Sequence, residues 1–179
     1  MTPRVGIGYD IHPFAQGRRL VLGGVALDGL GLDGHSDADA VAHAVADALC
    51  GAAALGDLGT LFPASDDRWL GADSMALLAD VAARAAARGL RLGNVDVVVN
   101  AETPRLGPHT AAMAANLERA LAPLVDGRDG GGADADGLPL VTVAAKRGEG
   151  LGPVCRGEGI AVWAVAVLDR RGPDAPAGA

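Results

Sequence analysis

GHSDADAVAHAVADALCGAAALGDLG, residues 34–59, is the stretch around which the chain is organised. Seven polar side chains stand here among residues that are almost all Ala, Val, Leu and Gly: His35, Ser36, Asp37, Asp39, His43, Asp47 and Asp57. Burying polar and charged groups beside apolar ones costs free energy unless a partner compensates them. A divalent cation is such a partner, so the stretch predicts part of a metal site.

The middle of this stretch predicts a helix over about residues 38–53, with the side chain of Asp37 capping its first turn. Asp39, His43 and Asp47 are spaced i, i+4, i+8 and therefore share one helix face. A histidine that binds metal through one ring nitrogen usually donates its other N–H to a carboxylate, and Asp39 or Asp47 would suit this role. The alternative is that His43 is a core histidine with satisfied hydrogen bonds, the commoner fate of a lone histidine on an apolar helix.

Residues 4–12 read RVGIGYDIH and alternate as a β-strand does. Alternation places Asp10 and His12 on one face, together with glycines that let another segment approach closely. With His43, these residues predict a site of two histidines and one carboxylate. The alternative from the strand alone is a polar edge that faces water.

Strands and helices alternate along the rest of the chain. The expected elements are a strand pair or a bent strand at residues 19–27, broken at Gly23-Gly24, further strands at 92–101, 140–145 and 156–168, and helices at 73–88 and 110–125. Residues 56–68 show no periodicity and predict a loop, which is a usual place for substrate contacts. This order predicts an α+β fold, a mixed β-sheet with helices packed on one face.

The composition bounds the class of protein. The net charge is −7 and no Lys/Arg cluster is long enough to bind nucleic acid or an anionic membrane, so neither is an expected partner. Two cysteines form no disulfide framework and no zinc motif, and the N-terminus lacks an apolar leader, which together predict a cytoplasmic protein. The length predicts one domain over residues 1–170, with 126–137 as a flexible linker inside it and 171–179 as a disordered tail.

Eight motifs follow one another in the chain: RVGIGYDIH at 4–12, LGGV at 22–25, GHSDAD at 34–39, GAAALGDLG at 51–59, FP at 62–63, GADS at 71–74, GNVD at 93–96 and RGEGIA at 156–161. In order and spacing they resemble the family of 2-C-methyl-D-erythritol 2,4-cyclodiphosphate synthases, which belongs to the non-mevalonate isoprenoid pathway. The resemblance covers nearly the whole chain apart from the linker and the tail.

The resemblance implies a homotrimer around a central axis, with three active sites at the subunit interfaces. It implies that Asp10, His12 and His43 bind zinc, one ion per subunit, and leave the fourth position to a substrate phosphate oxygen. Glu149 matches a carboxylate that holds a second ion, Mg²⁺ or Mn²⁺. His35 matches a residue that stabilises the transition state.

The resemblance also implies the contacts of the small-molecule substrate, a cytidine diphosphate conjugate. Asp10, Ile11, His12, His35 and Ser36 match residues around its phosphates and methylerythritol part. Asp57, Leu58, Gly59, Phe62, Pro63, Ala64, Ser65 and Asp66 match the methylerythritol pocket and its mobile loop. Ala101, Glu102, Thr103, Pro104, Arg105, Leu106 and Gly107 match a cytidine pocket lent by the neighbouring subunit, which Lys146, Arg147, Gly148 and Glu149 adjoin. Pro153 and Arg156 match residues that line the trimer axis.

The implied reaction is an intramolecular phosphoryl transfer. The 2-phosphate of 4-diphosphocytidyl-2-C-methyl-D-erythritol 2-phosphate attacks the β-phosphorus, CMP leaves, and a cyclic diphosphate forms. The substrate carries its own nucleophile, so the protein has to hold two anionic groups together and in line, which bound cations do by neutralising them.

The chain departs from the family at Lys146 and Arg147, where small hydroxyl residues are usual. The second of these positions is credited with transition-state stabilisation, which Arg147 would provide through its charge and planar fork, or would prevent by blocking the pocket. Two alternatives therefore stand beside the synthase. One is a non-catalytic homologue that binds zinc and an isoprenoid or nucleotide diphosphate. The other is a zinc hydrolase with Asp57 as its general base.

Overall fold

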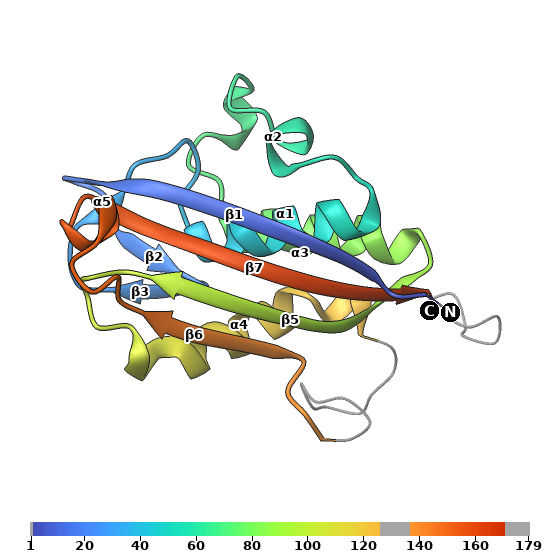
Figure 1. Ribbon diagram of the computed structural model, residues 1–179. Helices are drawn as coiled ribbons and strands as arrows, with labels where there is room; N and C mark the ends of the chain where they lie inside the picture. The colour runs from blue at the N-terminus through green and yellow to red at the C-terminus, as the bar shows by residue number, and fades with distance from the viewer. Residues whose placement is uncertain (1, 126–136, 171–179) are drawn as a thin grey trace.

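The computed structural model describes residues 2–125 and 137–170, and its centre is a five-stranded sheet in the order β4-β1-β7-β5-β6 (Figure 1). The strands are β1 (Arg4–Ala15), β4 (Gly31–Leu32), β5 (Leu90–Asn100), β6 (Val141–Lys146) and β7 (Gly159–Arg170). β5 and β6 run parallel and the other neighbours antiparallel, so the sheet is mixed. β2 (Leu20–Leu22) and β3 (Val25–Leu27) form a separate hairpin that turns at the two glycines.

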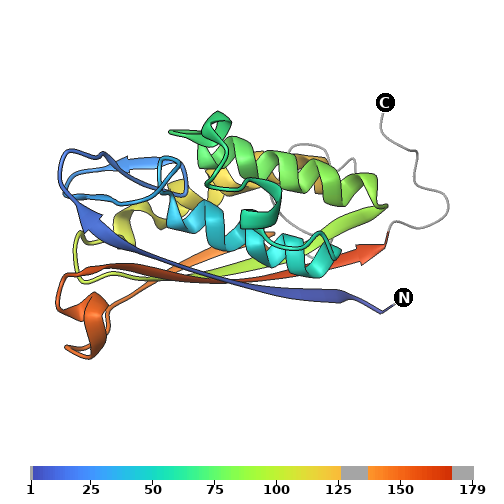
Figure 2. The same cartoon turned by 90° about the horizontal axis from the view of Figure 1, so that it is seen from above.

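Three helices cover one face of the sheet: α1 (Ala40–Ala53), α3 (Ser74–Ala87) and α4 (Thr110–Ala120) (Figure 2). The connections contain the short helices α2 (Leu58–Leu61) and α5 (Gly152–Cys155) and the 3₁₀ turns η1 (Asp67–Trp69), η2 (Gly107–His109) and η3 (Ala122–Leu124). The predicted α+β arrangement, with helices on one face of a mixed sheet, is confirmed. The helix expected over 110–125 is divided into α4 and η3, because Pro123 cannot continue an α-helix.

Two glycines of β1 let α1 lie directly against the sheet. Gly6 and Gly8 are buried, and a Cβ on either would stand 1.9 Å from a backbone oxygen of α1, that of Ala48 or Ala44 respectively. Any larger residue would force the helix away from the strand. The close approach predicted for this face is confirmed, and it brings residue 43 of α1 beside the polar end of β1.

The cap of α1 is Asp39 and not Asp37, so the predicted cap was wrong by two residues. The Asp39 carboxylate accepts hydrogen bonds from two backbone N–H groups of the first helical turn. The same carboxylate is fully buried and also accepts from the N–H groups of Gly23 and Gly24, in the turn between β2 and β3. Asp39 therefore ties the hairpin to the start of the helix.

The helices leave the other face of the sheet uncovered (Figure 2). This face carries exposed apolar side chains. They are Val5, Ile7, Tyr9 and Ile11 on β1 and Trp163 and Val165 on β7, all between 39% and 70% exposed. The rings of Tyr9 and Trp163 lie 5.2 Å apart between centroids. Monomeric proteins rarely expose contiguous apolar patches, so this surface has the character of a protein interface.

The expected flexible linker at residues 126–137, except for Gly137, and the expected tail at 171–179 lie outside the described residues. Within the part of the chain that is described, no helix has the length and apolar character that crossing a membrane requires.

Candidate metal centre and adjoining pocket

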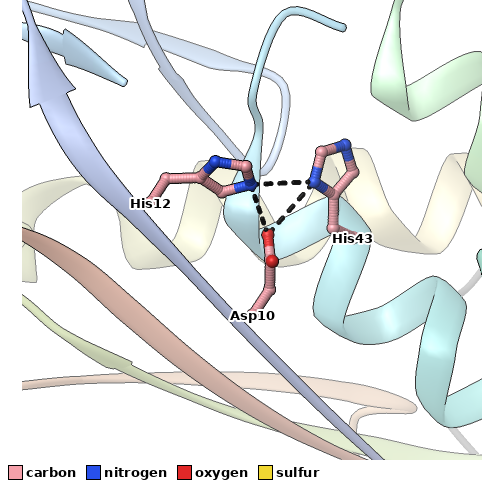
Figure 3. A group of neighbouring side chains, drawn as sticks. All are labelled: Asp10, His12 and His43. Carbon is pink, nitrogen blue, oxygen red and sulfur yellow. Dashed lines mark hydrogen bonds and ion pairs between the residues drawn. The ribbon is translucent and has the colours of Figure 1, made fainter. Parts of the chain in front are cut away.

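Asp10, His12 and His43 form a cluster near the end of β1, called here the metal-site cluster (Figure 3). Asp10 Oδ2 lies 2.9 Å from His12 Nε2 and 3.1 Å from His43 Nδ1, and the two ring nitrogens are 3.3 Å apart. Asp10 and His12 come from the same face of β1, and His43 comes from the first turn of α1. The convergence predicted from strand alternation and helix position is therefore observed.

The geometry of the metal-site cluster suits a tetrahedral ion. Metal–ligand bonds of about 2.0–2.1 Å place two ligand atoms of a tetrahedron about 3.3 Å apart. The three observed separations, 2.9, 3.1 and 3.3 Å, are close to that edge length. Two imidazole nitrogens and one carboxylate oxygen are a donor set typical of catalytic zinc, with one coordination position left for another ligand.

The second nitrogen of each histidine ring contacts a group outside the cluster. His12 Nδ1 bonds the backbone oxygen of Asp33, and since a carbonyl oxygen only accepts, Nδ1 carries the proton. His43 Nε2 lies 3.0 Å from Ser36 Oγ and 2.9 Å from Ser74 Oγ. The tautomers that follow from these partners turn the unprotonated nitrogens toward Asp10, as a bound cation requires.

Ser74 settles the proton position on His43. Its hydroxyl donates to the Asp37 carboxylate, which in its ionised form can only accept, so the same oxygen accepts from His43 Nε2–H. Asp37 thus supports the histidine through a serine. Sequence reasoning missed Ser74 as a site residue because it lies at the start of α3, far along the chain; the GADS motif was the one signal that pointed to it.

Neither Asp39 nor Asp47 supports His43, so the partner predicted from helical spacing was wrong. Asp39 accepts backbone N–H groups at the helix start. Asp47 Oδ1 accepts from the backbone N–H of Leu58 at 2.7 Å. Unpaired N–H groups at helix starts and in tight loops compete for carboxylates, and spacing along one helix does not reveal them.

The metal-site cluster keeps Asp10 ionised. Burial by itself would raise the pKa of Asp10, but the hydrogen bonds and charge that His12 and His43 supply when a proton, instead of a cation, occupies the nitrogen facing Asp10 outweigh it and lower the pKa to about 2. Burial would lower the pKa of His12, but the hydrogen bond and the charge of Asp10 outweigh it and raise the pKa above 6.5. Protons therefore compete with a metal for His12 in mildly acidic solution, whereas Asp10 remains available.

The loop that carries His35 and Ser36 is held from two sides. Arg18 donates to the backbone oxygen of Ser36, a contact that sequence reasoning did not anticipate. His35 Nε2 lies 3.4 Å from the backbone oxygen of Asp66, so the loop after α2 reaches His35. Asp57 is the N-cap of α2, where its carboxylate accepts a hydrogen bond from the backbone N–H of Thr60. Hydrogen bonds with Thr60 lower the pKa of this exposed carboxyl group. A lowered pKa makes Asp57 a weaker base than an ordinary carboxylate.

A pocket of about 410 Å³ lies at the ends of β5 and β6 and is called here the β5–β6 pocket. Its lining residues are Ala101, Glu102, Pro104, Arg105, Leu106, Gly107, Pro108, Ala145, Lys146 and Arg147. They include every residue predicted for the cytidine pocket except Thr103, together with Lys146 and Arg147. The Arg147 guanidinium donates to the Glu102 carboxylate across it.

The β5–β6 pocket and the metal-site cluster lie at the same end of the sheet, on different strands. On β7, which runs between them, Ile160 pairs with His12 of β1 and Ala161 pairs with Asn100 of β5. With neighbouring strands about 4.8 Å apart, β1 and β6 are separated by about 14 Å. One chain therefore presents the two groups side by side, with no lining residue in common.

Glu149 follows the β5–β6 pocket on an exposed turn. Within residues 2–125 and 137–170 it belongs to no cluster of three possible metal ligands. One carboxylate suffices for Mg²⁺ when phosphates supply other ligands. However, the hydrogen bond to Glu102 and, more weakly, the charge of Glu149 raise the pKa of Arg147. A dication at Glu149 would face this guanidinium, so these residues do not fit the expected second ion.

Gly148 directly precedes Glu149, and Pro153 and Arg156 lie in α5 and at its end. A Cβ at Gly148 would stand 1.9 Å from the sulfur of Cys155, so the glycine leaves room for that thiol. Pro153 lines a cavity of about 250 Å³ beside Glu158. Arg156 forms an exposed ion pair with Glu158 at 2.6 Å.

Residues 3–169 match the YgbB family. The chain belongs to the YgbB family. A 2-C-methyl-D-erythritol 2,4-cyclodiphosphate synthase of Thermosynechococcus vestitus is 49% identical over 169 residues, which are 94% of this chain and 97% of the relative. The family resemblance inferred from the motifs is thus confirmed.

Other members of the YgbB family extend the comparison. A bifunctional enzyme IspD/IspF of an Anaeromyxobacter species is 51% identical over 166 residues, 93% of this chain and 40% of the relative. The chain therefore spans about two fifths of that bifunctional protein. A solved structure of 2C-methyl-D-erythritol-2,4-cyclodiphosphate synthase, in its CDP-bound form, matches with a TM-score of 0.76 at 34% identity, over 93% of this chain and all of the other.

Proposed function

We propose that this YgbB-family chain is a phosphorus–oxygen lyase, a 2-C-methyl-D-erythritol 2,4-cyclodiphosphate synthase acting on 4-diphosphocytidyl-2-C-methyl-D-erythritol 2-phosphate. The observation that carries the proposal is the metal-site cluster, with ligand atoms 2.9–3.3 Å apart. The relative of that name from Thermosynechococcus vestitus is matched over 97% of its length. An oxygen of the 2-phosphate attacks the β-phosphorus and forms a new P–O–P linkage. The bond from the β-phosphorus to the bridging oxygen breaks, and CMP leaves with that oxygen.

The proposed roles of the residues combine their positions with the family resemblance. Asp10, His12 and His43 would hold zinc, which when bound neutralises and orients a phosphate oxygen. His35, on the neighbouring loop, and Arg147, in the β5–β6 pocket, would bind phosphate oxygens as negative charge shifts between them. Because the nucleophile belongs to the substrate, these residues contribute by holding reacting groups in line, which is worth roughly 7–11 kcal/mol in well-oriented systems.

We propose a homotrimer in which each active site combines the metal-site cluster of one subunit with the β5–β6 pocket of the next. The exposed apolar face of β1 and β7 supports this assembly, because burial against other subunits would remove it from water. Light scattering after size-exclusion chromatography should give three times the 17.8 kDa chain mass. Trp163→Glu, which places a charge on this face, should yield monomers; a wild-type monomer would contradict the assembly.

One incubation tests the activity. The purified protein is mixed with the cytidyl substrate and zinc, with and without Mg²⁺, and the products are separated by chromatography. CMP together with the cyclic diphosphate supports the synthase. CMP with a linear product would indicate the hydrolase, and tight nucleotide binding without CMP release would indicate the non-catalytic homologue.

His43→Ala tests whether the metal-site cluster carries the activity. Loss of one of three ligands should abolish zinc retention and CMP release together. His109→Ala is the matched control. His109 lies at the start of α4, outside the metal-site cluster, and the substitution removes the same kind of ring from there. Full activity of zinc-free His43→Ala would contradict the proposed function.

A further inference from the structure

The β5–β6 pocket concentrates positive charge in an acidic chain. Arg105, Lys146 and Arg147 line it, and Glu102 is the single carboxylate among the described lining residues, although the whole chain carries a net charge of −7. The rest of its wall is apolar or backbone, from alanine, proline, leucine and glycine. A ligand with a flat organic part and a phosphate chain suits such a wall.

In the ion pair between Arg147 and Glu102, a phosphate can take the place of the carboxylate. The Arg147 side chain is 58% exposed and that of Glu102 24%, so the carboxylate is the more fixed partner and the guanidinium the more mobile one. A guanidinium binds a carboxylate and a phosphate with the same planar fork. A phosphate that enters the pocket can therefore replace Glu102 as the partner of Arg147 without a change in backbone.

The same charges bear on the second ion expected at Glu149. The charge of Glu149 adds to the effect of Glu102 in raising the pKa of Arg147, so the side chains of Arg147 and Glu149 interact. Lys146 directly precedes Arg147 at the end of β6. A dication at Glu149 would have to bind against the positive charge of Arg147. A phosphate chain neutralised by Lys146 and Arg147 has less need of that dication.

We infer that Lys146 and Arg147 bind the diphosphate of a nucleoside diphosphate in the β5–β6 pocket in place of a second divalent cation, and that Glu102 holds Arg147 until phosphate displaces it. The identity of the ligand as a cytidine diphosphate rests on the proposed function; the charge arrangement of the pocket does not. Arg147 is thus a phosphate-binding residue, and Glu102 is a positioning residue that competes with the ligand.

Calorimetric titration of CDP into the zinc-loaded protein tests this, in buffer freed of Mg²⁺ and Mn²⁺ and again with Mg²⁺ added. For the wild type, Mg²⁺ should change the Kd by less than about threefold. Lys146→Thr with Arg147→Thr should weaken CDP binding without Mg²⁺ by about tenfold to a hundredfold, because charge-assisted hydrogen bonds are lost. In this double variant Mg²⁺ should restore much of the affinity.

Glu102→Gln gives a result that a purely structural ion pair would not. Removal of the competing carboxylate charge should tighten CDP binding by about threefold to tenfold, the opposite direction to loss of Arg147. Arg119→Thr, an exposed arginine on α4 that bonds Asn116, removes the same charge elsewhere and should leave the Kd unchanged. Weaker binding by Glu102→Gln, or at least tenfold tightening of the wild type by Mg²⁺, would overturn the inference.

These binding measurements need no turnover. If the predicted Kd pattern appears but no cyclic product forms, the pocket inference stands and the proposed function fails. If cyclic product forms only with Mg²⁺ and the double variant binds CDP as the wild type does, the proposed function stands and the inference fails.

Discussion

The metal-site cluster and the β5–β6 pocket differ in how firmly their side chains are held. Both histidines of the cluster have a further contact through the second ring nitrogen, one to the Asp33 backbone and one to Ser74. In the pocket, Lys146 and Arg147 are exposed, and Arg147 bonds the one carboxylate of the lining, Glu102. Packing and histidine tautomers determine what the metal-site cluster can bind, whereas net charge determines what the β5–β6 pocket can bind. Substitutions near the cluster should therefore act on stability and zinc affinity, and those in the pocket on anion affinity.

Gly8→Ala is expected to have the largest effect on stability and zinc retention. Its new Cβ would stand 1.9 Å from the Ala44 backbone oxygen, so α1 must move and carry His43 away from Asp10. Overpacking against backbone should lower the free energy of unfolding by about 2–3 kcal/mol or more and reduce zinc retention. Chemical denaturation and metal analysis measure the two quantities.

Gly51→Ala is the matched control for Gly8→Ala. Gly51 lies in α1, and a Cβ there would meet only Gly6 Cα at 3.7 Å, an ordinary contact. The substitution should stabilise the protein by up to about 1 kcal/mol through helix propensity and leave zinc in place. Equal loss in both variants would refute the view that the β1–α1 contact positions the cluster.

Ser74→Ala should have the next largest effect, confined to the metal-site cluster. Without the hydroxyl, His43 Nε2–H loses the link to Asp37, and zinc affinity should fall by about tenfold to a hundredfold. Competition with a chromophoric chelator gives the affinity. Thr142→Ala removes another hydroxyl that bonds a carboxylate, that of Asp96 on the exposed part of the sheet, and should leave zinc affinity unchanged.

A change of pH is expected to have a smaller and gradual effect on zinc affinity. Because the pKa of His12 is raised above 6.5, a proton occupies His12 at lower pH and must leave before zinc binds. Zinc affinity should be full above that pKa and fall by about tenfold per pH unit below it. Asp10, with a pKa of about 2, should add nothing to this slope between about pH 5 and 8. A flat profile over that range would show that His12 is not a ligand.

The sequence predicted the ligands of the cluster better than their support. Alternation in β1 placed Asp10 and His12 together, and the helix supplied His43, because each is a local pattern. Ser74 and Arg18 were missed, since their roles arise from contacts between segments that only the folded chain brings together. The local sequence does not distinguish a residue that only begins a helix from one that also contacts a histidine on a different helix.

The same limit explains the error over the helix cap. Asp37 and Asp39 both precede an apolar helical run, and either suits an N-cap by propensity. The choice of Asp39 depends on the N–H groups of Gly23 and Gly24, which lie in a separate hairpin. Asp37 is thereby left to bond Ser74. The architecture itself, a mixed sheet with helices on one face, needed only the order of elements and was predicted correctly.

The smallest expected effect on stability belongs to the double substitution of Lys146 and Arg147 by Thr. Exposed ion pairs such as that of Arg147 with Glu102 contribute little to folding, so the free energy of unfolding should change by less than about 0.5 kcal/mol. Zinc affinity should also stay unchanged, because β7 and β5 separate these residues from β1. Denaturation and chelator competition measure both. A loss of zinc in this variant would show that the two regions are coupled, within one chain or across the proposed subunit interface, and the contrast between a packed metal site and a charge-governed pocket would no longer hold.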